Sequence, residues 1–160
     1  KSISRLIAWM ERHQAADGSW IPLWFGDQDA ENELSPVYGT ATAVEYLTHS
    51  SNPATRPLIA KGIEYLLSAQ NEDGGWGGAK GVRSKVTLTS RALSALASVE
   101  NPAMESIERG FAYLYEMWQA DMLYREEPIG LYFARLWYSE QMYNMVFTLI
   151  ALKKLREIIK

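Results

Sequence analysis

The chain has 160 residues, a formal net charge of −3 at pH 7 and no cysteine. This length suits one domain that buries about 68–70% of the surface of its unfolded chain. An acidic balance argues against nucleic acid as a partner, and the lack of cysteine excludes disulfides and thiolate metal sites. Six tryptophans and nine tyrosines remain to be placed.

The spacing of apolar residues predicts six helices, which glycine and proline clusters separate. No segment shows a convincing strand pattern, so the expected fold class is all-α. The long segments alternate with segments that are rich in small and apolar residues, which indicates three helical hairpins. The predicted helices cover about residues 2–14, 38–49, 58–70, 87–99, 103–120 and 140–159.

One phrase occurs twice in the chain. Residues 5–20 read RLIAWMERHQAADGSW, and residues 61–76 read KGIEYLLSAQNEDGGW. A third, degenerate copy begins at Arg109, where the glutamine and the final tryptophan no longer align. Since one such hairpin cannot bury its apolar face alone, we expect the hairpins to stack as a single domain over residues 1–160. The first two copies align at three key positions: Gln14 with Gln70, Gly18 with Gly74 and Trp20 with Trp76.

This phrase resembles the QW motif of the squalene and oxidosqualene cyclases. Two further stretches are similar to the same family, VYGTATAVEYL at residues 37–47 and IGLYFARLWYSEQMYNMVFTLIAL at residues 129–152. The resemblance implies the C-terminal part of a squalene-hopene-type cyclase, a terpene cyclase of isoprenoid biosynthesis, with its hairpins forming about half of an (α/α)6 toroid. We expect each glutamine to bond helix-terminal groups and to lie against its indole, as a clasp between successive helices.

Members of that family guide carbocations along an aromatic cavity, because π-faces stabilise positive charge without reacting. Leu136 stands where the family usually has phenylalanine, and Glu140 where it usually has tyrosine. A carboxylate there would act as a terminating base, mark a different substrate, or lie at the surface in a lineage that lost the reaction. Aromatic residues at helical spacing are equally typical of an ordinary core. The resemblance places six residues at the cavity: Trp24, Tyr38, Tyr132, Leu136, Glu140 and Tyr143.

The family protonates its substrate with an Asp-x-Asp-Asp motif, which lies upstream of the matched region. The nearest string here, Asp27-Gln28-Asp29-Ala30, lacks the third aspartate, and we expect it to be a solvated surface loop. We therefore expect this chain to be a piece of a longer parent and inactive alone. No catalytic residue, metal or cofactor is assigned to it.

Other classes of function stay open. A non-catalytic toroid module for binding or scaffolding would have its cavity plugged by side chains. A zinc-dependent prenyltransferase needs ligands that this chain lacks, since it has no cysteine and His13 and His49 stand apart. A carbohydrate-active enzyme needs two acids ~5–10 Å apart. The candidate acids for such a pair are Asp27, Asp29, Glu31, Glu33, Glu126 and Glu127.

The expected partners follow from the resemblance and from the incomplete toroid. They are a squalene-like polyprene in the parent protein, the remainder of the parent chain, and a second copy of this chain, because half a toroid leaves apolar edges uncovered. The resemblance implies a parent on the cytoplasmic side of a membrane, attached to one face of it. The fragment itself is expected to be soluble, since it has no apolar run of about 18 residues.

Overall fold

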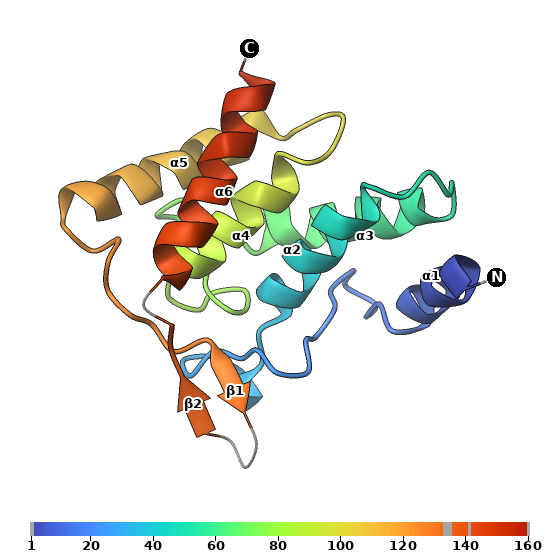
Figure 1. Cartoon of the computed structure of the whole chain (residues 1–160), viewed down its shortest axis with the longest axis horizontal. Helices are drawn as coiled ribbons and strands as arrows, with labels where there is room; N and C mark the ends of the chain where they lie inside the picture. Colours follow the sequence, from blue (N-terminus) through green and yellow to red (C-terminus); the bar gives the residue numbers. More distant parts are fainter. Residues whose placement is uncertain (1, 133–135, 141, 160) are drawn as a thin grey trace.

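The computed structural model describes residues 2–132, 136–140 and 142–159, and most of them form helices (Figure 1). The helices are α1 (Ser2–Arg12), α2 (Pro36–Leu47), α3 (Thr55–Ser68), α4 (Val86–Leu96), α5 (Met104–Gln119) and α6 (Tyr143–Ile158). Helices α2, α4 and α6 form an inner row, in which α4 packs against both neighbours. Outside this row, α3 packs on α2 and α5 packs on α4. The alternation confirms the predicted helical hairpins.

Helix α4 is the centre of the inner row. Every residue of α4 is buried, because α2, α5 and α6 cover it on different sides. Its small side chains allow close approach, and two of its hydroxyl groups bond to α6. Ser90 lies 3.0 Å from the hydroxyl of Thr148, and Thr87 donates to the amide oxygen of Asn144. These bonds fix the position of α6 along α4.

The hydrophobic core lies between the inner and outer rows. Val44 from α2, Leu66 from α3 and Leu93 from α4 are fully buried there. Burying a side chain of this size stabilises the folded state by about 1.5–3 kcal/mol. Helices α3 and α5 bury the side that faces an inner helix, and α5 exposes Phe111, Tyr115 and Trp118 elsewhere on its surface.

Two short antiparallel strands precede α6, β1 (Gly130–Tyr132) and β2 (Leu136–Tyr138). The prediction that no segment forms a strand is therefore wrong. Three residues are too few to show an alternating pattern. The pairing also depends on tertiary contacts, since Phe25 bridges to Gly130, and a side chain at Gly130 would overlap the ring of Tyr138. The sixth helix accordingly begins at Tyr143, later than predicted.

Helix length bears on membrane insertion. The longest helices, α5 and α6, have 16 residues each, whereas a span needs about 20 apolar residues. Within the described ranges, no helix combines the length and the apolarity that crossing a bilayer requires.

Candidate functional site

The second copy of the repeated phrase forms a clasp made of Gln70, Gly74 and Trp76. The amide nitrogen of Gln70 donates to the carbonyl oxygen of Gly74 at 2.8 Å and to that of Ser106 at 2.9 Å. The hydroxyl of Ser106 donates back to the amide oxygen of Gln70 at 2.8 Å. One side chain thus joins the turn after α3 to the first turn of α5.

The first copy forms a matching clasp made of Gln14, Gly18 and Trp20. The Gln14 amide donates to the carbonyl oxygens of Gly18 at 2.9 Å and of Leu58 at 3.0 Å. Leu58 precedes Lys61 by three residues, as Ser106 precedes Arg109. The two glutamines therefore bond to equivalent carbonyl groups, and the copy that begins at Arg109 keeps the register of the repeat although its own glutamine is lost.

Each clasp requires glycine for two physical reasons. Gly18 has a φ of +90° and Gly74 a φ of +86°, in the left-handed region that favours glycine. A Cβ at Gly18 would overlap the carbonyl oxygen of Lys61 on α3, and one at Gly74 would overlap that of Arg109 on α5. Each turn can reach the next outer helix only because this side chain is absent.

The tryptophan of each clasp links three helices. The Trp76 indole nitrogen donates to the Leu66 carbonyl oxygen on α3 at 2.7 Å, and its backbone nitrogen donates to the Thr89 hydroxyl on α4 at 2.9 Å. Its ring also lies against Gly110 on α5, where a Cβ would be 2.8 Å from the ring. The first clasp repeats this pattern. Trp20 bonds to Met10 and Thr40 and lies against Gly62.

The inner helices and the loop before α2 form an aromatic cluster around Arg91, which consists of Phe25, Tyr38, Arg91, Tyr143 and Phe147. The guanidinium carbon of Arg91 lies 5.6 Å from the ring centroid of Tyr38 and 5.2 Å from that of Phe147. Phe25 stacks on Tyr38 with centroids 4.2 Å apart, and Tyr143 stacks on Phe147 at 5.4 Å. A cation therefore already lies over two of the electron-rich faces.

Both tyrosines of the cluster stay neutral near pH 7. Burial raises the pKa of Tyr38, although the charge of Arg91 opposes the shift. Burial, with smaller contributions from Tyr138, raises the pKa of Tyr143 to about 12. These phenols are weak acids in the fold and suit a wall of π-faces better than a role in proton transfer.

A charged network shares Arg91 with the aromatic cluster and joins all three inner helices. Arg91 lies 2.9 Å from one carboxylate oxygen of Glu45, and Lys154 lies 2.7 Å from the other. Arg91 also donates to the Thr42 hydroxyl at 2.8 Å, but its buried Nε has no hydrogen-bond partner. Burial alone would raise the pKa of Glu45, but the Lys154 hydrogen bond and the charges of Arg91 and Lys154 outweigh it and lower that pKa. Two cations thus share one carboxylate.

The structure brings together only some of the predicted cavity residues. Tyr38 and Tyr143 meet in the cluster, whereas Trp24, Leu136 and Glu140 are exposed. Tyr132 lies in β1, and its side chain falls outside the described part of the chain.

Sequence reasoning missed four residues around this cluster. A usable signal exists for Glu45 and Arg91, because each is the single charged residue of its helix. Lys154 has no such signal, since Lys153 and Arg156 lie beside it on α6. Phe147 carries no such signal, since an aromatic residue on α6 looks like ordinary core. The missed residues are Glu45, Arg91, Phe147 and Lys154.

The acidic loop before α2 is not a solvated surface loop throughout, which corrects the prediction. Asp27 is fully buried, 2.6 Å from the amine of Lys85, and accepts the backbone N–H of Gly78 at 2.8 Å. Lys85 also lies 3.1 Å from Asp29, whose pKa is lowered by the hydrogen bond and charge of Lys85. A run of acids in sequence looks solvated, but a lysine distant in sequence neutralises this one.

Three of the acids proposed for a carbohydrate site, Asp27, Asp29 and Glu127, are held in ion pairs. Arg83 bridges Asp29 at 3.3 Å and Glu127 at 3.5 Å. Burial raises the pKa of Glu127, against the opposing charges of Lys85 and Arg83. Within the described ranges, no group of three or more His, Cys, Asp or Glu side chains is placed to hold a metal ion. These ion pairs hold the acidic loop before α2 against the residues that precede α4.

Fold and clasps together define a class. Helical hairpins joined by repeated Gln, Gly and Trp contacts form an α/α repeat protein, and its inner helices carry most of the aromatic cluster. Residues 1–157 match the squalene-hopene cyclase C-terminal domain family. The chain belongs to this family, which has the helical toroid fold of terpene cyclases, and its hairpins form about half of that (α/α)6 toroid.

Curated relatives agree with this assignment. An ent-copalyl diphosphate synthase from Streptomyces sp. is 27% identical over 89% of this chain and 24% of its own length. For a squalene–hopene cyclase from Zymomonas mobilis, the identity is 28% over 96% of this chain and 24% of that protein. A drimenyl diphosphate synthase from Streptomyces showdoensis is 29% identical over 95% of this chain and 28% of its own length. The chain spans about a quarter of the length of these relatives.

Proposed function

We propose that this chain forms part of the cavity wall of a terpene cyclase that folds and cyclises a polyprenyl substrate. The observation that carries the proposal is that Tyr38 and Tyr143, which lie far apart in sequence, belong to one aromatic cluster in which Arg91 and Phe147 link them. Electron-rich faces stabilise a desolvated cation by about 2 kcal/mol or more. The names of the relatives, which are cyclases and diphosphate synthases, support the same class of reaction.

The proton donor of this reaction lies outside the chain. Asp27 is engaged by Lys85 and by the backbone of Gly78, so its carboxylate is held in a structural ion pair. The chain alone is therefore inactive. The remainder of a parent protein supplies the acid.

A second candidate is the non-catalytic module, which one observation favours. Arg91 places a permanent positive charge against Tyr38 and Phe147. Two unit charges about 5 Å apart repel by about 3 kcal/mol at an effective dielectric constant of about 20. A carbocation beside these rings is disfavoured by that amount, except where the Glu45 carboxylate offsets it. In this second reading, Arg91 and its partners plug the space between the inner helices.

The deciding experiment uses the full-length protein that contains this chain. It is incubated separately with squalene and with linear prenyl diphosphates, and products are identified by gas chromatography and mass spectrometry after dephosphorylation where needed. Cyclic products from either substrate class are expected. Tyr38→Leu is expected to reduce the yield at least tenfold, whereas Tyr38→Phe keeps the ring and most of the activity.

Tyr124→Leu is the matched control, because this exposed tyrosine lies outside the cluster. Equal activity of Tyr38→Leu and Tyr124→Leu would remove the aromatic cluster from the mechanism. No product from any of the substrates, with a folded protein, would favour the non-catalytic module.

A further inference from the structure

The charged network of the inner helices has one positive charge in excess. Arg91 and Lys154 both pair with the carboxylate of Glu45, and within the described residues no second carboxylate forms an ion pair with either cation. The exposed fraction of the side chain is 7% for Arg91, 9% for Glu45 and 21% for Lys154. A charge that is removed from water is costly unless an opposite charge neutralises it. The network therefore lacks one negative charge.

Arg91 is the cation with a donor left over. Lys154 donates to Glu45 at 2.7 Å and to the Ser98 hydroxyl at 2.6 Å. The guanidinium of Arg91 uses one terminal nitrogen for the ion pair with Glu45 and the other for Thr42, whereas its Nε is buried without a hydrogen-bond partner. Buried donors in native proteins are almost always satisfied, so this one indicates a missing partner. The missing negative charge thus belongs beside Arg91.

The neighbours of Arg91 leave surface that a ligand can touch. Tyr38, Thr42 and Phe147 contact the guanidinium, and each of the three is only partly buried. They come from α2 and α6, on either side of α4. A molecule that lies on the two rings is therefore adjacent to a cation that is itself almost completely buried.

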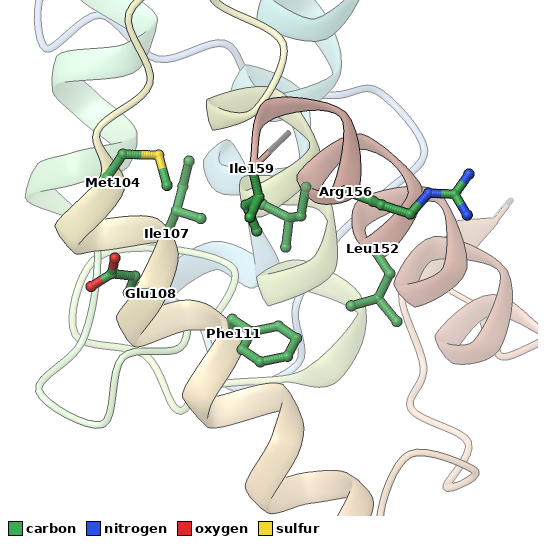
Figure 2. A pocket seen from close by; sticks show the side chains of 8 residues that line it. Met104, Ile107, Glu108, Phe111, Leu152, Arg156 and Ile159 are labelled. Atoms are coloured by element: carbon green, nitrogen blue, oxygen red, sulfur yellow. The ribbon is translucent and has the colours of Figure 1, made fainter.

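The apolar pocket between α5 and α6 does not share this charge imbalance (Figure 2). Its volume is about 670 Å³, and the charged groups of its lining are one acid, Glu108 on α5, and one base, Arg156 on α6. The two charges cancel, so the pocket offers an anion no net attraction. The excess positive charge is a property of the inner row.

We propose that Arg91 binds the diphosphate group of a linear prenyl diphosphate, and that the cavity thereby selects this substrate class over a hydrocarbon such as squalene. The inference rests on the proposed function, because it names the substrate class of the same aromatic wall. A polyprenyl chain carries negative charge as its diphosphate ester. A guanidinium donates charge-assisted hydrogen bonds to phosphate oxygens, which are about twice as strong as neutral ones. The prenyl chain lies on the rings of Tyr38 and Phe147.

The charge of Arg91 has opposite effects on the two substrate classes. It repels a carbocation that forms beside the rings of Tyr38 and Phe147. A bound diphosphate carries several negative charges, so it attracts the guanidinium and reverses the sign of the local field. The cation therefore helps a cyclase whose substrate brings its own negative charge, and hinders one whose substrate is a hydrocarbon.

The test measures binding to the full-length protein that contains this chain. Isothermal titration calorimetry compares farnesyl diphosphate with farnesol, its uncharged alcohol. The wild-type protein is expected to bind the diphosphate at least about tenfold more tightly, since hydrogen bonds to charged groups are stronger than neutral ones. Arg91→Gln is expected to abolish this preference, and Arg91→Lys to keep most of it because the positive charge remains.

Arg56→Gln is the matched control, because Arg56 is an exposed arginine on the outer helix α3. It is expected to bind both ligands as the wild type does, and circular dichroism checks that each variant is folded. An unchanged preference in folded Arg91→Gln overturns the proposal. Equal binding of both ligands by the wild type overturns it too, whether or not Arg91→Gln folds. That second result is expected if a carboxylate elsewhere in a parent protein neutralises Arg91.

This inference and the proposed function can fail separately. If the wild-type protein cyclises squalene at least as fast as the prenyl diphosphates, the inference is overturned and the proposed cyclase stands. If the diphosphate binds through Arg91 but no substrate gives a cyclic product, the inference stands and the proposed function is contradicted.

Discussion

Gly74 shows how a single residue sets the distance between hairpins. Its left-handed φ of +86° turns the chain, and its missing side chain lets the turn touch the backbone of Arg109 on the next outer helix. Gly81 also has a positive φ, +75°, but a Cβ there would meet nothing within 4 Å. Comparing Gly74 with Gly81 therefore separates the cost of backbone strain from the cost of close approach to another helix.

Gly74→Ala is expected to lower the free energy of unfolding by about 3 kcal/mol, because strain at a left-handed position adds to overlap with α5. Gly81→Ala is expected to cost only about 1–2 kcal/mol, since strain acts alone. Urea denaturation followed by circular dichroism measures both values. Equal losses would mean that the turn does not press on α5.

At the scale of elements, the buried pair of Asp27 and Lys85 joins a loop to a helix. Lys85 is the residue that precedes α4, and Asp27 lies in the acidic loop before α2. Both side chains are almost completely buried, so their charges are removed from water and must neutralise each other. The pair therefore positions the loop against the start of α4.

Lys85→Met is expected to destabilise the fold by about 3–5 kcal/mol, because it leaves the Asp27 charge buried without a partner. The double variant with Asp27→Asn is expected to recover part of this loss, which a double-mutant cycle measures. Arg83→Met is the control, since Arg83 is exposed and its ion pairs are worth about 0–1 kcal/mol. A loss for Lys85→Met as small as that of the control would contradict the structural role.

At the scale of the whole molecule, Glu45 holds the inner row together. Its carboxylate on α2 pairs with Arg91 on α4 and Lys154 on α6. The pKa of Glu45 stays below its ordinary value of 4.5, because the two cations outweigh the effect of burial. The unfolded chain therefore takes up this proton before the folded chain does, and acid favours unfolding.

The contribution of Glu45 to stability is expected to be complete above pH 4.5 and to be lost as the pH falls through its lowered pKa. Glu45→Gln lacks this titration, so its unfolding free energy should be lower near pH 7 but change less between pH 5 and pH 3. Urea unfolding at several pH values checks the slope. Parallel pH profiles of the wild type and the variant would contradict the assignment.

Prediction from sequence succeeded where one short segment carries its own signal. Amphipathic spacing located the six helices, and the repeated phrase gave the register of the hairpins. Tyr38 and Tyr143 were placed at the cavity only through the family resemblance, and the structure brings them together. That they form a catalytic wall stays a prediction.

Two of the failures depend on partners distant in sequence. Asp27 looked solvated until Lys85 was placed beside it, and the role of Arg91 was missed because its aromatic partners lie on two other helices. The strands β1 and β2 were missed because three residues carry too little pattern. For Asp27 and Arg91 the deciding contact joins segments that local periodicity does not connect.

The sequence by itself determined the hairpin repeat, its clasps and the family. The glycine turns, the helical spacing and the positions of Gln and Trp are local properties, so they can be recognised by aligning one segment with another. Only the tertiary structure decided that a guanidinium covers the aromatic faces and that an acid in a polar loop is buried. Burial and charge pairing are properties of neighbours in space, and the free energy of a buried charge depends on the partner that folding brings to it.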